Sequence, residues 1–152
     1  MPHAVRRAVA VVFSCALGGA VLAAGSAAFR DPLDAPAPPT RFLATTHLGA
    51  VARAGGRLVA VGVRGLIVLS DDRGATWRQA ASPVGSDLVA VRFASPRRGW
   101  ASGHDGVILG TTDGGEHWTK LLDGRQAAGL LAAHFAQRAA AGDAQAERLR
   151  KE

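Results

Sequence analysis

The sequence predicts an all-β fold made of two repeats of four short strands, and three observations support this. Residues 57–79 and 98–120 align without a gap at an offset of 41 positions, and eight of the 23 aligned pairs are identical. The apolar runs are short and bounded by glycine-rich turns, which is typical of strands. Each repeat also ends in the same turn-and-tryptophan motif. Because a period near 40 is that of a propeller blade, the sequence indicates a partial β-propeller of two four-stranded blades.

The strands follow from the apolar runs and the turns between them. We expect Arg64-Gly65 to form a two-residue turn in the middle hairpin of the first repeat, and Ser95-Pro96 to interrupt the second repeat. The expected strands are 47–53, 58–63, 66–70 and 76–80 in the first repeat, and 88–94, 100–103, 107–111 and 117–122 in the second.

The repeated motif is an Asp box, S/T-x-D-x-G-x-T-W, which turns the chain between the third and fourth strands. The hydroxyl and the carboxylate can accept hydrogen bonds from backbone N–H groups of the turn, the glycine can take a positive φ, and the tryptophan can anchor the hairpin. In the second box His117 replaces the threonine. A role in binding metal or substrate is the alternative to this structural role. The structural residues are Ser70, Asp72, Gly74, Trp77, Thr111, Asp113, Gly115 and Trp118.

The N-terminus has the order of an export signal. Arg6 and Arg7 precede an apolar stretch that ends in the small residues around Ala28. We expect residues 1–28 to be a signal peptide and the rest of the chain to be exported to the periplasm; an uncleaved membrane anchor is the alternative. Residues 29–45 are predicted to be an extended proline-rich linker that does not pack, and residues 46–123 to be the two blades.

The composition favours an acidic partner. The chain carries 18 Lys+Arg against 12 Asp+Glu, but the charge is dispersed, so we expect a protein partner, acidic or membrane-associated, and no nucleic acid. The single cysteine, Cys15, excludes a disulfide framework, and the five histidines show no metal-ligand spacing. The sequence indicates no cofactor and no metal. The candidate partner-binding residues, on the hairpin turns and a neighbouring loop, are Arg64, Arg97, Arg98, His104 and Asp105.

Residues 99–118 resemble the repeat of photosystem II stability/assembly-factor-like proteins, which are exported Asp-box (bacterial neuraminidase repeat) β-propellers. The resemblance covers about half of the chain, from His47 to Leu122. It implies a non-catalytic protein that binds or scaffolds early photosystem II intermediates. The residues that match this repeat are Gly99, Trp100, Gly103, Gly106, Ile108, Thr111, Asp113, Gly114, Gly115 and Trp118.

The sequence departs from this family in size, because a propeller closes with about 4–8 blades and these residues supply two. Truncation of a longer protein, a non-functional remnant and assembly of several copies through the open blade edges are the alternatives.

An enzyme is the competing class, because sialidases share the Asp box. Their chemistry needs a tyrosine nucleophile, and the chain contains no tyrosine. The sequence therefore favours a binding protein over a glycoside hydrolase fragment.

The C-terminal segment, residues 124–152, is alanine-rich and predicts a helix over Arg125–Ala141 that ends near Gly142. Asp143 is expected to cap a second short helix. The helix is either a docking or membrane-surface element or an insertion that lies against the blades.

Overall fold

The computed structural model describes residues 29–149. The predicted signal peptide, with Cys15, lies outside the described residues.

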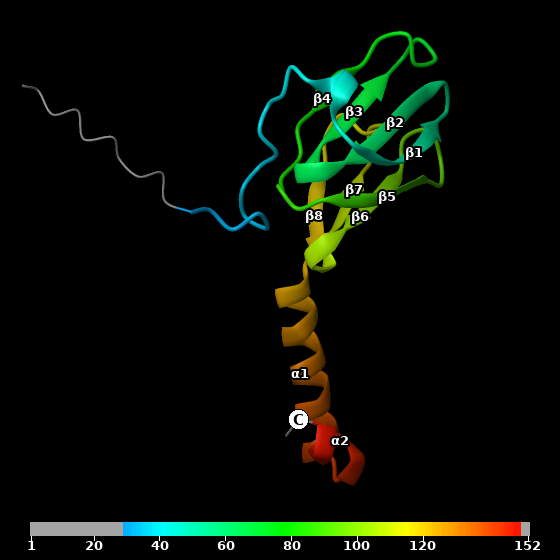
Figure 1. The fold of residues 1–152 in the computed structure, drawn as a ribbon. Helices are drawn as coiled ribbons and strands as arrows, with labels where there is room; N and C mark the ends of the chain where they lie inside the picture. Colours follow the sequence, from blue (N-terminus) through cyan, green and yellow to red (C-terminus); the bar gives the residue numbers. More distant parts are fainter. Residues whose placement is uncertain (1–28, 150–152) are drawn as a thin grey trace, which may run out of the picture.

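The described residues form two four-stranded antiparallel sheets, each a meander in which every strand pairs with the next (Figure 1). Such consecutive sheets fit two blades of a partial β-propeller, which confirms the predicted fold class. Every strand boundary lies within two residues of its prediction. The strands are β1 (Leu48–Ala54), β2 (Arg57–Gly62), β3 (Ile67–Ser70), β4 (Arg78–Ala80), β5 (Leu88–Phe93), β6 (Gly99–Gly103), β7 (Ile108–Thr111) and β8 (Thr119–Leu122).

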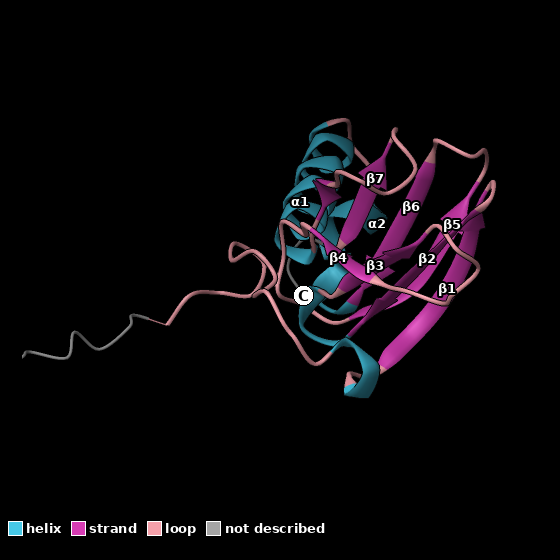
Figure 2. Cartoon of the chain, turned by 90° about the horizontal axis from the view of Figure 1, so that it is seen from above, coloured by secondary structure: helices cyan, strands magenta, loops and turns pink. Residues whose placement is uncertain are grey.

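One apolar core lies between the two sheets, which pack side by side with β1 next to β5 (Figure 2). Successive side chains of a strand point to opposite faces of its sheet. One of the two faces formed by β2 and β3 packs against the second sheet. The buried apolar residues of this interface include Val59, Val61, Ile67 and Leu69 from the first sheet and Leu88, Val91, Leu109 and Trp118 from the second.

The middle hairpins close through short 3₁₀ turns, η2 (Val63–Gly65) and η3 (His104–Gly106), which are one residue longer than the predicted two-residue turn. Arg64 and Asp105 take the left-handed conformation there, with φ of 56° and 57°. At Gly65 a Cβ atom would lie 1.9 Å from the carbonyl oxygen of Val84, so the close approach of that backbone requires glycine.

The proline-rich segment packs against the sheets, although the sequence predicts an unpacked linker. Leu33 is buried in the core between the sheets. Gly85 N–H donates to the carbonyl of Pro32, and Lys120 Nζ donates to the carbonyl of Leu33 at 2.7 Å. The prediction is wrong at Leu33 because this residue lies in a turn, in which Asp34 N–H donates to the carbonyl of Asp31, and the carbonyls of the turn accept from distant donors. A 3₁₀ turn, η1 (Leu43–Thr45), connects this segment to β1.

The C-terminal segment forms α1 (Gly124–Ala140) and α2 (Ala144–Leu149), and α1 leads away from the sheets rather than lying against them (Figure 1). Asp123 caps α1 by a capping box, in which its carboxylate accepts from Gln126 N–H and the Gln126 side chain accepts from Asp123 N–H. Asp143 accepts from the N–H groups of Gln145 and Ala146, which confirms its predicted capping role. Within residues 29–149, neither helix is long and apolar enough to cross a membrane.

Candidate functional site

The turn between β3 and β4 is held by its own side chains. Gly74 N–H donates to Ser70 Oγ at 2.7 Å, and Thr76 donates to Asp72 through both its N–H, at 2.9 Å, and its hydroxyl, at 2.6 Å. The Trp77 indole N–H donates to the carbonyl of Gly74 at 3.1 Å. The first turn therefore uses its carboxylate and its indole to satisfy its own backbone.

The turn between β7 and β8 repeats this arrangement. Gly115 N–H donates to Thr111 Oγ1 at 3.1 Å, and the Trp118 indole N–H donates to the carbonyl of Gly115 at 2.9 Å. His117 takes the part of threonine: its N–H donates to Asp113 Oδ1 at 3.0 Å, and its Nδ1 lies 2.7 Å from Asp113 Oδ2. Imidazole can therefore replace a hydroxyl here without loss of the contact.

These hydrogen bonds stabilise the ionised carboxylates of both turns. Bonds from the side chain and the N–H of Thr76 lower the pKa of Asp72 from 3.8 to about 2. The N–H of His117, followed by its side chain, lowers the pKa of Asp113 to about 2. Among residues 29–149, no group of three or more His, Cys, Asp or Glu side chains is placed to hold a metal ion. The carboxylates of Asp72 and Asp113 therefore act as hydrogen-bond acceptors within their own turns.

A polar network joins the two turns across the sheets. Arg57 of β2 lies 2.6 Å from Asp71 of the first turn and 2.8 Å from Glu116 of the second. Arg78 of β4 donates to the same Glu116 carboxylate at 2.9 Å. The Arg78 guanidinium, and then Arg57, lowers the pKa of Glu116. Glu116, at a variable position of the motif, therefore links the second sheet to the first.

A groove of about 840 Å³ lies at the other end of the first sheet, between the proline-rich segment and η2. Its cations are Arg41, whose guanidinium lies 5.2 Å from the centre of the Phe42 ring, and Arg64 of η2. Among the described residues, no carboxylate forms a salt bridge with either of these arginines. The remaining lining residues are Pro38, Pro39, Thr40, Thr46, Val63 and Leu66.

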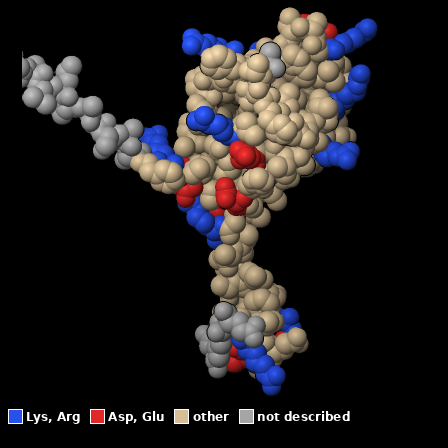
Figure 3. Space-filling model, viewed as in Figure 1, with Lys and Arg blue, Asp and Glu red and all other residues tan. Residues whose placement is uncertain are grey.

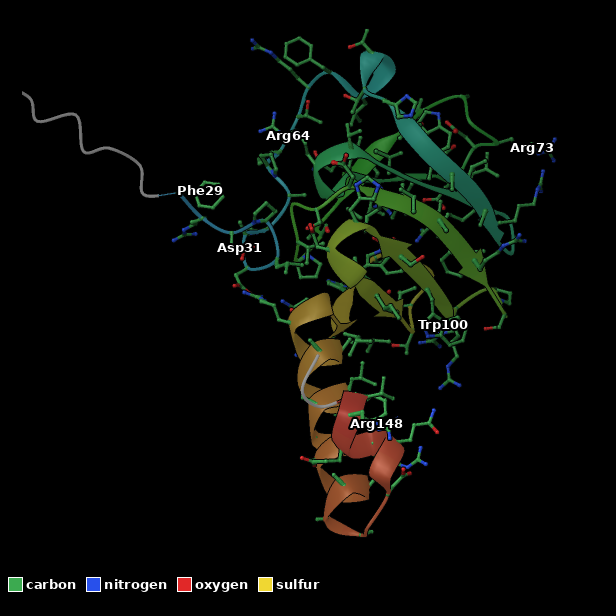
Figure 4. The ribbon with its side chains drawn as sticks, turned by 60° about the horizontal axis from the view of Figure 1, so that its bottom comes forward. Phe29, Asp31, Arg64, Arg73, Trp100 and Arg148 are labelled. Carbon is green, nitrogen blue, oxygen red and sulfur yellow. The ribbon has the colours of Figure 1, made fainter. Side chains whose placement is uncertain are left out.

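The structure divides the five candidate partner-binding residues between two ends of the sheets. Arg64 and the η3 pair, His104 and Asp105, lie at one end, where the loop before β5 joins them: Asp87 accepts from the N–H groups of Arg64 and His104, and Ser86 donates to Asp105. Arg97 and Arg98 lie at the opposite end beside the second turn, where the carbonyl of Arg97 accepts from Gly114 N–H at 2.9 Å. Figure 4 shows the two ends, with Arg64 on one side of the molecule and Arg73 of the first turn on the other.

Local sequence patterns did not indicate Arg41, Phe42 or the bridging role of Glu116. Arg41 and Arg64 are separated by a strand hairpin, and only the folded chain brings them to one groove. A further unpredicted cluster joins the proline-rich segment to α1, where Arg125 donates to Asp34 at 2.8 Å. Figure 3 shows acidic and basic side chains together where the helix leaves the sheets. The signal for the α1 cap was present, because Asp123 and Gln126 have capping-box spacing.

Comparison with known proteins gives short matches. No family model matches the chain. Over 48 residues the chain is 44% identical to the chloroplastic photosystem II stability/assembly factor HCF136 of Cyanidioschyzon merolae. This match covers 30% of the chain and 11% of that protein. Over 66 residues the chain is 32% identical to the photosystem II assembly lipoprotein Ycf48 of Synechococcus sp.. This match covers 41% of the chain and 20% of that protein.

The chain therefore spans between about a tenth and a fifth of the length of these relatives. Among solved structures, a similar chain is that of YCF48 bound to D1 peptide, with 24% identity and a TM-score of 0.47; the match covers 51% of this chain and 26% of that one.

Proposed function

We propose that the chain is a non-catalytic, exported Asp-box propeller protein that binds a protein partner during assembly of a membrane-protein complex. The observation that carries this proposal is the groove with Arg41 and Arg64, two cations without a carboxylate partner among the described residues. The Asp boxes themselves supply structure, since Asp72 and Asp113 accept hydrogen bonds from within their own turns.

The occupant of the groove is an extended acidic segment of the partner. Guanidinium groups form paired hydrogen bonds with carboxylates, and an exposed arginine pair therefore favours Asp or Glu side chains or a chain terminus. The prolines and Phe42 add an apolar wall against which an extended segment can pack. Electrostatic attraction of this kind raises the rate of encounter as well as the affinity.

Photosystem II is the proposed complex because both named relatives are photosystem II assembly proteins. Export to the periplasm, or to an equivalent compartment, agrees with the lipoprotein and chloroplastic relatives and with the predicted signal peptide. Binding of a membrane-protein segment needs no catalytic residue, and we expect the full chain to leave a fluorogenic sialoside unhydrolysed.

The acidic-segment proposal is tested by fluorescence anisotropy with a labelled Asp/Glu-rich peptide and its Asn/Gln counterpart. The full chain should bind the acidic peptide more tightly, and Arg41→Glu with Arg64→Glu should abolish the difference. Arg97→Glu with Arg98→Glu is the matched control, because it reverses two charges at the opposite end. If the control pair abolishes binding and the groove pair does not, the site lies beside the second turn instead. Equal affinity for both peptides overturns the proposal.

The assembly role is tested separately with purified photosystem II reaction-centre complex and the immobilised full chain. Retention of the complex by the wild-type chain, and its loss with Arg41→Glu and Arg64→Glu, is the expected result. Equal retention by both chains excludes the groove, and no retention excludes this complex as the partner.

A further inference from the structure

The interface between the two sheets supplies a template for a second interface. The face of the first sheet formed by Val59, Ile67 and Leu69 is buried against the second sheet. The opposing face of the second sheet contains Leu88, Val91 and Trp118, which are also buried. Because the two sheets are repeats, each of these faces has an equivalent on the outside of the pair.

The outer face of the first sheet repeats the buried residues of the second. The strand registers pair Val51 with Ala60 and Val91 with Ala101, so Val51 is the equivalent of Val91, and Leu48 that of Leu88. Leu48 is 40% exposed and Val51 62%, whereas Leu88 is 1% exposed and Val91 4%. The same side chains are thus buried in one sheet and exposed in the other. The first open face consists of the exposed Leu48 and Val51 and the half-buried Trp77, around Ala60 and Val68, which are themselves buried.

The outer face of the second sheet repeats the buried residues of the first. Trp100 and Ile108 are the equivalents of Val59 and Ile67. Leu121, at a register shift between β7 and β8, lies on the same face, where a Cβ atom at Gly110 would lie 2.8 Å from its Cδ1. Val59 is fully buried, whereas Trp100 is 41% and Leu121 53% exposed, and Figure 4 shows Trp100 at the outer side of the sheet pair. The second open face consists of Trp100, Ile108 and Leu121.

The segment before each first strand also repeats. Leu43 packs on the first open face beside Val68 and Trp77, and Val84, in the corresponding segment before β5, is buried within the interface between the sheets. Leu43 therefore has the position of Val84 in a sheet-to-sheet interface, and it leaves Leu48 and Val51 exposed.

From this repetition we propose that the chain associates head to tail with a second copy of itself, the second open face of one copy packing on the first open face of the next. The proposal rests on the repeated interface and is independent of the proposed partner binding. The contact is heterologous, so it leaves one face of each kind free and continues until a ring closes. Burial of the two apolar faces provides the driving force.

A hollow on the first open face lies where the repeat places Trp100 of the next copy. In the interface within the chain, the equivalent residue, Val59, lies close to Gly115 of the second turn. The corresponding glycine of the first turn, Gly74, borders a groove of about 520 Å³ together with Ala60 and Trp77. Trp100 is larger than Val59, and this open groove can accept its ring.

One polar contact of the interface between the two sheets of a chain has no equivalent in the proposed interface between copies. Within the chain, Arg57 reaches Glu116 across the interface. The equivalent pair between copies is Arg98 and Ala75, which lacks a carboxylate. Ala75→Glu should therefore add the missing ion pair and strengthen association.

Light scattering of the full chain over a range of concentrations tests the proposal. The wild-type mass should exceed that of one chain, and Trp100→Glu should weaken association by about 30-fold or more, as for a central interface residue. Leu130→Glu is the matched control, because Leu130 is an exposed apolar residue of α1 outside both faces. It should leave the mass unchanged, and Ala75→Glu should raise it at a given concentration.

Three outcomes would overturn the proposal: a wild-type chain that stays monomeric at its highest soluble concentration, association that Leu130→Glu removes, or association that Trp100→Glu leaves intact. Circular dichroism of Trp100→Glu and Ala75→Glu verifies that each variant keeps its strands. If Trp100→Glu does not fold, Ala75→Glu decides the question, because a lack of tighter association then contradicts the proposed geometry.

Discussion

Arg57 Nη1 lies 2.8 Å from Glu116 Oε1, and this contact joins the motif turn of the second sheet to the first. Arg57 also donates to the carbonyl of Gly114 at 3.2 Å, so the guanidinium holds both the side chain and the backbone of that turn. The two repeats are therefore connected by polar contacts at one end as well as by the apolar core.

We expect Glu116→Gln to lower the free energy of unfolding by about 0.5–1 kcal/mol, because a partly exposed ion pair contributes little beyond this in water. Urea unfolding of the wild type, Glu116→Gln, Arg57→Met and the double variant measures the coupling. The effects of the two single substitutions should not add, because each of them removes the same contact between Arg57 and Glu116. Strict additivity would show that the contact contributes no stability.

Trp118→Ala should destabilise the chain by about 3–5 kcal/mol, because it removes a buried indole from the core. Trp77→Ala is the comparison in the first turn, and it should cost less because Trp77 is only half-buried. Urea unfolding followed by far-ultraviolet circular dichroism gives both values. A larger loss at Trp77 than at Trp118 would contradict the assignment of the core between the sheets.

Acid should unfold the protein as the turn carboxylates are protonated. The folded-state pKa of Asp113 is about 2, below the ordinary value of 3.8, so its contribution is complete above pH 3.8 and is lost as pH falls toward 2. Asp113→Asn should therefore be less stable than the wild type at pH 5, and this difference should shrink between pH 4 and 2. A difference that stays constant with pH would show that the charge of Asp113 is not what stabilises the turn.

Gly65→Ala should destabilise the chain by at least about 2 kcal/mol, because its φ is positive and the new Cβ would overlap a carbonyl oxygen. Gly56→Ala is the control, since no atom lies within 4 Å of a Cβ there. Thermal unfolding of the two variants should separate them by several degrees. Similar melting temperatures would mean that the η2 turn can relax away from Val84.

Local patterns predicted the repeats, the strands and the motif turns, because their signals lie within a few residues of one another. The boundaries of β4 and β8 differ by two residues because Thr76, Trp77, His117 and Trp118 belong to the turns through their hydrogen bonds. The burial of Leu33 could not be predicted, since its carbonyl is fixed by Lys120, 87 positions away in the chain.

The candidate binding surface was predicted only in part. Arg64 was found from its place in a hairpin turn, but its neighbour Arg41 lies in a segment expected to be an unpacked linker. The arginine pair at 97–98 was named in one set with Arg64, although it lies on the connection before the hairpin turn, and consecutive connections of a meander lie at alternate ends of the sheet. The antiparallel pairing of β5 with β6 places it at the opposite end.

Hydrogen exchange of the indole N–H groups tests the central claim, that the repeated turn-and-tryptophan unit is architecture. The chain has three tryptophans, so three indole signals can be followed by NMR. In dilute solution the Trp118 indole, which donates to the carbonyl of Gly115 in the core, should exchange most slowly, and the exposed Trp100 indole fastest. Exchange of Trp118 at the rate of an unfolded peptide would contradict the account.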